Sequence, residues 1–168
     1  MTGPHDDIPL STLVERGGVF YKLPGTTVES CIAELIRRTP CLNDAESGAS
    51  GGFNAEFLRA VLEREALMPT GIGRGIALPH PRNPLITEAG RQCVSIGFPA
   101  VPVDWKALDG KPIHTALLIA SASAKFHLRA LLKINFLCRE EGFLSLLQEQ
   151  APRDRIIGAI RDIERGWK

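Results

Sequence analysis

The chain has 168 residues, of which 44% are hydrophobic and 23% are charged, and its formal net charge is +1. This length predicts a single domain over residues 1–168, with a core over about 8–165 and a flexible tail over 1–7. The balanced charge lacks the basic excess of nucleic-acid-binding proteins, and no apolar run reaches the roughly 18–20 residues that span a bilayer, so we expect neither nucleic-acid binding nor membrane insertion.

Hydrophobic periodicity and turn residues predict strands and helices mixed along the chain. In the first half of the chain we expect a strand or helical turn at 8–14, a strand at 19–23, a helix at 28–38, a surface loop at 43–52 and a helix at 55–67. Thr27 and Asn54 are the expected N-caps of these two helices. In the second half we expect strands at 76–78, 92–98 and 113–120, and helices at 124–139, 143–150 and from Pro152 to about 165. Because Ser30 stands where a capping box has Glu or Gln, we expect no reciprocal box at Thr27. The mixture predicts an α/β (α+β) fold, a mixed sheet sandwiched between helices.

The cysteines indicate a reducing compartment. Cys31, Cys41, Cys93 and Cys138 lie far apart and form no C-x-x-C pair. Apolar neighbours around Cys93 and Cys138 favour buried free thiols. The polar N-terminal segment M-T-G-P-H-D-D does not resemble a signal peptide. We therefore expect a cytoplasmic protein.

The stretch before and after His80 holds the strongest functional candidate. Three glycines lead into the apolar run Ile76–Leu78, and His80 then stands between Pro79 and Pro81. Glycines permit tight turns and prolines stiffen the backbone, so His80 is expected on a rigid strand end. A histidine at a strand end is more often structural, but this clamp favours function. Neutral imidazole is a nucleophile at cellular pH.

Two other residues are candidates for the same site. His127 opens the helix at 124–139 directly after a strand, where ligands gather in open α/β sheets and helix N–H groups favour anions; the alternative is a solvent-facing helix residue. Arg64 lies near the end of the helix that precedes the glycines. Its guanidinium could hold phosphate oxygens and lower the pKa of a nearby histidine, although a solvated surface charge is the more frequent role of such an arginine.

Other classes of site fit the sequence poorly. The metal-binding spacings H-x-x-x-H, H-E-x-x-H and C-x-x-C do not occur, so we expect no metal. The run G-I-G-R-G lacks the G-K-[ST] ending of a P-loop, and it precedes a strand instead of following one, which argues against a dinucleotide fingerprint. We therefore expect no cofactor.

The motif that ends at His80 resembles a known phosphorylation signature. Glu65, six further residues and then I-G-x-x-I-A-L-P-H are similar to the signature of IIA proteins of the bacterial phosphotransferase system, mannitol/fructose type (EIIA type-2), which includes the nitrogen-regulatory IIA proteins. The pair Arg64-Glu65, the segment D-G-K-P-I and the pair His127-Leu128 resemble other blocks of this family. The resemblance covers roughly 8–165.

This resemblance implies a fold, three site residues and a set of partners. The fold would be a mixed sheet sandwiched between helices. His80 would be phosphorylated through Nε2, His127 would support the phosphoryl group, and Arg64 would be the active-site arginine. The donor would be an HPr-like phosphocarrier protein, and a IIB component or a regulatory target protein would act downstream.

Pro81 departs from the family, in which a small residue, often Gly, follows the histidine. Proline has no backbone N–H to donate to a phosphate oxygen. The site would then use other donors, such as Thr70 and the amide of Gly73, or transfer would be slower. The loop at 43–52 also looks longer than usual.

Three functions stay open on the sequence. One is a phosphocarrier that passes its phosphoryl group on or uses it as a regulatory signal. A second is a sugar-specific IIA component that serves a separate IIB/IIC permease. The third is a IIA-like binding module that has lost phosphotransfer, which only Pro81 supports.

Overall fold

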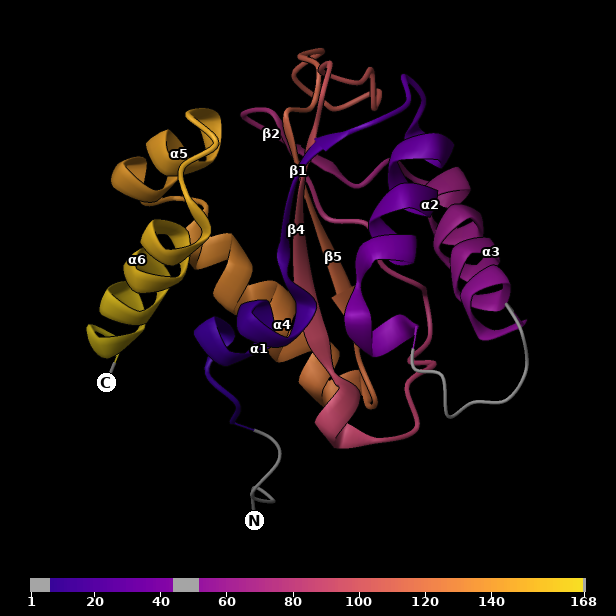
Figure 1. Cartoon of the computed structure of the whole chain (residues 1–168), viewed down its shortest axis with the longest axis horizontal. Coiled ribbons are helices and arrows are strands. Elements are labelled where there is room, and N and C mark those ends of the chain that lie inside the picture. Colours follow the sequence, from indigo (N-terminus) through magenta and orange to yellow (C-terminus); the bar gives the residue numbers. More distant parts are fainter. Residues whose placement is uncertain (1–6, 44–51, 168) are drawn as a thin grey trace.

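A five-stranded mixed sheet forms the centre of the computed structural model, which describes residues 7–43 and 52–167 (Figure 1). The strands are β1 (Val19–Leu23), β2 (Gly71–Gly73), β3 (Ile76–Ala77), β4 (Cys93–Pro99) and β5 (Thr115–Ala120). The helices are α1 (Leu10–Gly17), α2 (Val28–Arg38), α3 (Gly52–Leu67), α4 (Ala124–Leu137), α5 (Glu141–Gln148) and α6 (Arg153–Arg165), with short 3-10 turns η1 (Pro40–Leu42) and η3 (Ala89–Arg91). The tail predicted at 1–7 and the loop predicted at 43–52 lie almost entirely outside the described residues.

The strand order is β1-β4-β5-β3-β2. β4 and β5 are antiparallel, with Cys93 opposite Ala120 and Gly97 opposite Ala116. β1 runs parallel to β4, and β3 runs parallel to β5. Every residue of β4 and β5 is buried, as expected for central strands covered on both faces.

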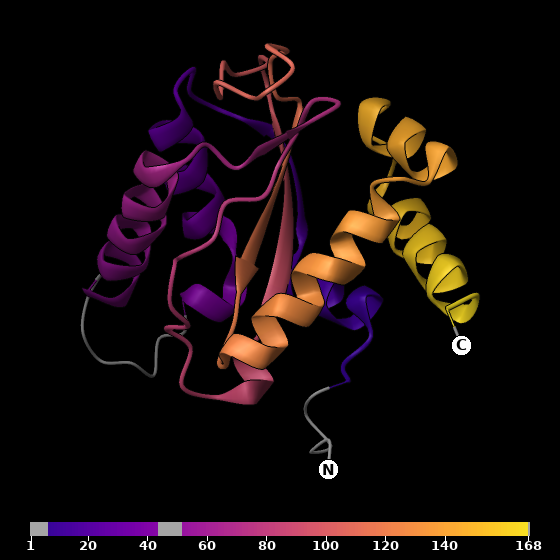
Figure 2. The ribbon, with the colours of Figure 1, turned by 180° about the vertical axis from the view of Figure 1, so that it is seen from behind.

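In the part of the chain that the structure describes, two helices cover one face of the sheet and four cover the other (Figures 1 and 2). α2 and α3 pack on one face, around a core that includes Ile32, Leu35 and Phe57. On the other face, α1, α4, α5 and α6 share a second core with Ile134 and Ile156. The predicted α/β sandwich is confirmed.

One ambiguous and one mistaken prediction at helix starts have physical explanations. Residues 10–14 of the ambiguous stretch lie in helix α1. A distant side chain caps the start of this helix: the Glu164 carboxylate accepts hydrogen bonds from Leu10 N and from Ser11 N and Oγ. At α2 the expected absence of a capping box is wrong. Thr27 Oγ1 accepts from Ser30 N, and Ser30 Oγ accepts from Thr27 N, both at 3.1 Å, because a serine hydroxyl can replace the usual carboxylate.

Helix α3 begins at Gly52 instead of 55. Asn54 therefore lies inside the helix, and it is not the N-cap that the sequence predicts. Its side-chain amide donates to the Asn43 side-chain oxygen, so this asparagine makes a tertiary contact in place of a cap.

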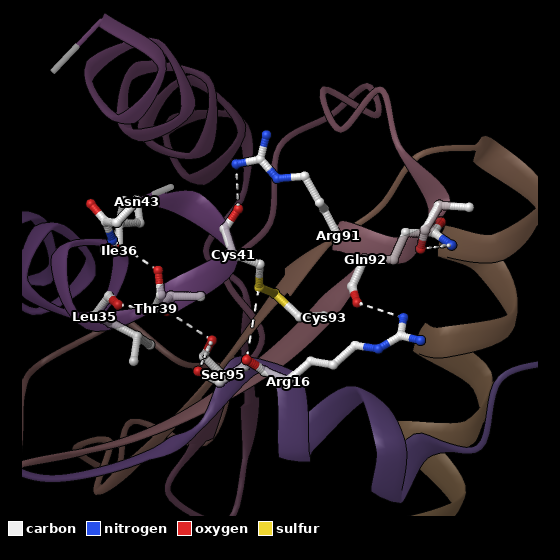
Figure 3. Close-up of a disulfide and its surroundings, with 12 residues drawn as sticks. Arg16, Leu35, Ile36, Thr39, Cys41, Asn43, Arg91, Gln92, Cys93 and Ser95 are labelled. Atoms are coloured by element: carbon white, nitrogen blue, oxygen red, sulfur yellow. Dashed lines mark hydrogen bonds between the residues drawn. A yellow bond between two sulfur atoms is a disulfide. The ribbon is translucent and has the colours of Figure 1, made fainter. Parts of the chain in front are cut away.

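The prediction of four free thiols is wrong for Cys41 and Cys93, which form a disulfide across 52 residues of sequence (Figure 3). Cys41 lies in η1, and Cys93 begins β4. Cys31 and Cys138 are free and buried, as predicted, and burial raises the pKa of both thiols to about 12. The predicted cytoplasmic location therefore loses the support of two of its four thiols.

Tertiary contacts bring the two disulfide cysteines together. Thr39 Oγ1 and Ser95 Oγ share a buried hydrogen bond of 2.8 Å, and Arg91 donates to the Cys41 carbonyl at 2.8 Å (Figure 3). These contacts hold η1 against the start of β4. Sequence spacing carries no sign of such long-range packing.

Candidate functional site at the end of strand β3

His80 lies on an extended segment that continues β3. Leu78 N donates to Thr70 O at 3.0 Å, and Ile119 N donates to Pro79 O at 3.1 Å, so this segment is held on both sides. The His80 side chain is buried, with 7% of the residue exposed. The rigid strand end that the flanking prolines predict is therefore present.

A backbone carbonyl sets the orientation of the His80 ring. His80 Nδ1 lies 2.6 Å from Leu78 O. Because a carbonyl oxygen only accepts hydrogen bonds, Nδ1 carries the proton in the neutral ring and Nε2 keeps its lone pair. The backbone thus selects the tautomer in which Nε2 is the nucleophilic atom.

His127 lies in the first turn of α4, beside His80. The centroids of the two imidazole rings are 4.8 Å apart, and the ring planes are inclined by 49°. Ser123 caps the helix by accepting from Phe126 N at 3.1 Å, and Ser121 Oγ lies 3.2 Å from His127 Nδ1. The end of β5 and the start of α4 together aim the second histidine at the first.

Arg64 lies in the last turn of α3, where its Nη1 donates to Met68 O at 2.9 Å. Its positive charge lowers the pKa of both His80 and His127, so it is within electrostatic reach of both rings. Of the three residues predicted for the site, His80 and His127 thus lie side by side, and Arg64 acts on both from the end of α3 through its charge.

Burial is the main cause of both histidine pKa shifts. It lowers the pKa of His80, the Leu78 carbonyl opposes the shift, and Arg64 adds to it while Glu65 opposes it. The pKa of His127 falls to about 4 through burial and the charges of His80 and Arg64. Both rings are thus neutral at pH 7. Two neutral imidazoles beside a guanidinium suit a nucleophile that receives an anionic group.

Thr70 and Gly73 lie at opposite ends of the β2–β3 hairpin. Thr70, next to Leu78, donates from its N and Oγ1 to the Glu65 carboxylate, each at 2.7 Å. Gly73 pairs with Ile76 near the hairpin turn and adopts a φ of 92°. Their predicted role as phosphate donors stays a prediction.

Sequence reasoning gave no role to two residues of this region, Glu65 and Trp105. Glu65 was visible as the first position of the signature that ends at His80. Trp105, whose indole Nε1 donates to Glu65 Oε1 at 2.7 Å, follows β4 in an irregular segment and carried no sequence signal.

Within residues 7–43 and 52–167, no group of three or more His, Cys, Asp or Glu side chains is arranged to hold a metal ion. Over the same residues, no helix combines the length and apolar character needed to cross a membrane.

Comparison with known proteins identifies the family. Residues 17–163 match the family model described as "Phosphoenolpyruvate-dependent sugar phosphotransferase system, EIIA 2". The chain belongs to this EIIA 2 family. A fructose-specific EIIABC component from Bacillus subtilis (strain 168) is 32% identical over 156 residues, which cover 90% of this chain and 23% of that relative. This chain therefore spans less than a quarter of that protein.

Relatives of a second kind match over nearly their full length. A nitrogen regulatory protein from Pseudomonas aeruginosa is 28% identical over 164 residues, which cover 95% of this chain and 99% of the relative. EIIA 2 proteins with sugar-specific names and with nitrogen-regulatory names are thus both similar to this chain.

Solved structures share the fold. The crystal structure of nitrogen regulatory protein IIA-Ntr from Neisseria meningitidis superimposes with a TM-score of 0.72 at 19% identity, over 89% of this chain and 97% of that one. The mannitol IIA of Escherichia coli, solved in complex with phosphorylated IIB, gives a TM-score of 0.62 at 17% identity, over 96% of this chain and 98% of that one. At these identities the likeness concerns the fold alone.

Proposed function

We propose that this EIIA 2 protein is a phosphocarrier that accepts a phosphoryl group on His80 Nε2 from an HPr-like phosphocarrier protein. The observation that carries the proposal is the 2.6 Å contact between His80 Nδ1 and Leu78 O. It places the proton on Nδ1 and leaves the Nε2 lone pair available for attack.

In the proposed step, the Nε2 lone pair forms a bond to phosphorus while the P–N bond of the donor phosphohistidine breaks, and the donor nitrogen keeps that electron pair. The Nδ1 proton stays on His80, held by the Leu78 carbonyl. Arg64 and neutral His127 offer donors to the phosphoryl oxygens, so catalysis is mostly positioning and charge stabilisation. The step needs neither ATP nor Mg²⁺, because the donor bond is already reactive.

Exposed apolar side chains beside the site support a protein donor over a small molecule. Leu67 and Met68 follow Arg64, and Leu128 follows His127; they are 66%, 65% and 60% exposed. Large exposed apolar residues around a buried reactive atom are typical of a surface that meets another protein.

We propose that the phosphoryl group then passes to a IIB-type component, as the Escherichia coli complex of mannitol IIA with phosphorylated IIB suggests. Regulation is the second candidate, favoured by the nitrogen regulatory relative that matches over 99% of its length. A new phosphate adds about −1.5 to −2 charge beside the apolar side chains, which would change partner preference in either case.

The test is incubation with phosphorylated HPr-like carrier, followed by mass-spectrometric mapping of the phosphorylated residue. Wild type should gain one acid-labile phosphate at His80, and His80→Ala should gain none. His114→Ala is the matched control, since His114 is half-buried but bonds Thr115 instead of lying at the site. Uptake by His80→Ala would refute the assignment, and no uptake by wild type would favour the module that has lost phosphotransfer.

A further inference from the structure

The Glu65 carboxylate accepts three short hydrogen bonds at the end of α3. Its Oε1 accepts from Thr70 N and from Trp105 Nε1, and its Oε2 accepts from Thr70 Oγ1, each at 2.7 Å. The two partners are buried, with 7% of Thr70 and 1% of Trp105 exposed. Hydrogen bonds to a carboxylate in such surroundings are stronger than neutral ones, so this cluster is rigid.

The cluster is connected to His80 through the backbone. Thr70 O accepts from Leu78 N at 3.0 Å, and Leu78 O takes the His80 Nδ1 contact at 2.6 Å. Glu65, Thr70, Leu78 and His80 therefore form one continuous series of hydrogen-bonded groups. A shift of Thr70 would move the carbonyl that orients the imidazole ring.

We propose that Glu65 is a positioning residue for His80: by holding Thr70 and Trp105 it fixes the Leu78 carbonyl, and with it the direction of His80 Nε2. The inference rests on the proposed function, because the positioned atom is the phosphoryl acceptor. Glu65 does not itself meet the phosphoryl group. Its effect reaches the reaction through ring geometry, and misplacement of a reacting atom by about 1 Å can cost about 10²-fold in rate.

Glu65 also acts through its charge. The groups that influence the pKa of His80 are Arg64 and Glu65 from α3 and the Leu78 carbonyl. The ring of His127 from α4 lies beside it. Burial and Arg64 lower the pKa, whereas Glu65 raises it. Loss of the Glu65 charge should therefore lower the pKa of His80 still further.

Two substitutions separate geometry from charge. Glu65→Gln keeps an oxygen for Thr70 N and Trp105 Nε1, and its amide can donate to Thr70 Oγ1, so the cluster survives without the charge. Glu65→Ala removes every acceptor and leaves the donors of Thr70 and Trp105 without partners. Glu63→Ala, an exposed position on the same helix, is the matched control.

The first measurement is the rate of phosphoryl uptake from phosphorylated carrier. Glu65→Ala should lower the rate at least about tenfold at pH 7.5. Glu65→Gln should stay within about threefold of wild type, and Glu63→Ala should match it. A folded Glu65→Ala protein with the wild-type rate would overturn the proposal.

The second measurement uses NMR on the free protein, with no phosphoryl donor. Glu65→Ala should shift the Trp105 indole N–H resonance and expose the His80 Nδ1–H to solvent exchange, whereas Glu65→Gln should preserve that N–H and lower the pH midpoint of the His80 ring. An unchanged His80 Nδ1–H in Glu65→Ala would refute the positioning role. Wild type that takes no phosphate would refute the proposed function alone, since the NMR result still decides the role of Glu65.

If Glu65→Ala does not fold, two further variants, Thr70→Val and Trp105→Phe, test the positioning role of Glu65. Each removes one donor to Glu65 and keeps most of the buried volume. Each should lower the uptake rate at least about threefold and increase solvent exchange of the His80 Nδ1–H. Wild-type rates and exchange in both variants would overturn the proposal.

Discussion

The imidazole of His80 faces the imidazole of His127 with 4.8 Å between the ring centroids, and Arg64 lowers the pKa of both. Two protonated rings at this separation would repel each other, so the pair favours the neutral forms. A phosphoryl group on His80 would reverse this preference at His127, because an adjacent anion stabilises an imidazolium. The second histidine is thus suited to respond to the charge state of the first.

Removal of the second ring should affect chemistry more than folding. His127→Ala should lower the rate of phosphoryl uptake by about 10²-fold, the loss expected for one group that stabilises transition-state charge. Because His127 is only partly buried, the free energy of unfolding should change by about 1 kcal/mol or less. Rapid-quench phosphotransfer and urea denaturation measure the two effects, with His114→Ala as the control. A wild-type rate in His127→Ala would remove this residue from the site.

The protein should lose stability in mild acid. The pKa values of His80, His114 and His127 are lowered by burial, that of His127 to about 4, from an unfolded value of about 6.5. Between these values the unfolded chain binds more protons than the folded protein, so stability is complete above about pH 6.5 and falls as the pH drops toward 4. Each histidine contributes at most about 1.4 kcal/mol per pH unit, and less where it is partly exposed.

Urea denaturation at pH 7 and pH 5 measures this acid effect. The urea concentration at the unfolding midpoint of wild type should be lower at pH 5 than at pH 7, and this decrease should be smaller in His127→Gln. Equal decreases in the two proteins would show that His127 is not the neutral ring described above.

The Cys41–Cys93 disulfide should be detectable by counting thiols. Alkylation of unfolded protein without reductant should label Cys31 and Cys138 alone, and prior reduction should raise the number to four. Because the bridge closes 52 residues of sequence, reduction should lower the free energy of unfolding by about 2–4 kcal/mol. Peptide mapping with four labelled cysteines before reduction would contradict the pairing.

Pro81→Gly should increase phosphoryl uptake. The substitution restores a backbone N–H directly after His80, and a hydrogen bond to a charged phosphate contributes about 1.5–3 kcal/mol, so an increase of about tenfold is expected. The added chain entropy should lower stability by about 1 kcal/mol. The rate is measured as phosphoryl uptake from phosphorylated carrier, in reactions quenched at a series of times. If the rate stays at the wild-type value, the missing N–H does not limit transfer, and Pro81→Ala shows whether glycine flexibility hides a gain.

Local pattern predicted the elements that depend on local chemistry. β1 and α2 have the predicted bounds. The β-branched and aromatic residues of β1 and the threonine cap of α2 act within a few residues, so the local sequence is enough to predict them. The same holds for His80, whose prolines and glycines are adjacent to it. His127 and Arg64 became candidates for the same site from their positions after a strand and at a helix end, and the family resemblance implied their roles. In the structure the rings of His80 and His127 lie side by side, and the charge of Arg64 acts on both.

Apart from the Thr27–Ser30 capping box, which is local, the mistakes concern contacts between distant segments. The cap of α1 comes from Glu164, and Cys41 meets Cys93 because η1 packs on β4, so neither is visible in neighbouring residues. Trp105 is missed as a partner of Glu65 for the same reason. Gly71–Gly73 also reads as a turn, but its edge position lets it pair with β3 as a short strand.

The bonds from Glu164 to Leu10 and Ser11 have a consequence for biosynthesis. Helix α1 is completed by a side chain of α6, more than 150 residues further along the chain, and α1 also packs on β4 in the middle of the sheet. During synthesis α1 therefore lacks its cap until Glu164 has left the ribosome. The emergence of Glu164 should then set the earliest time at which α1 is stably held against the sheet.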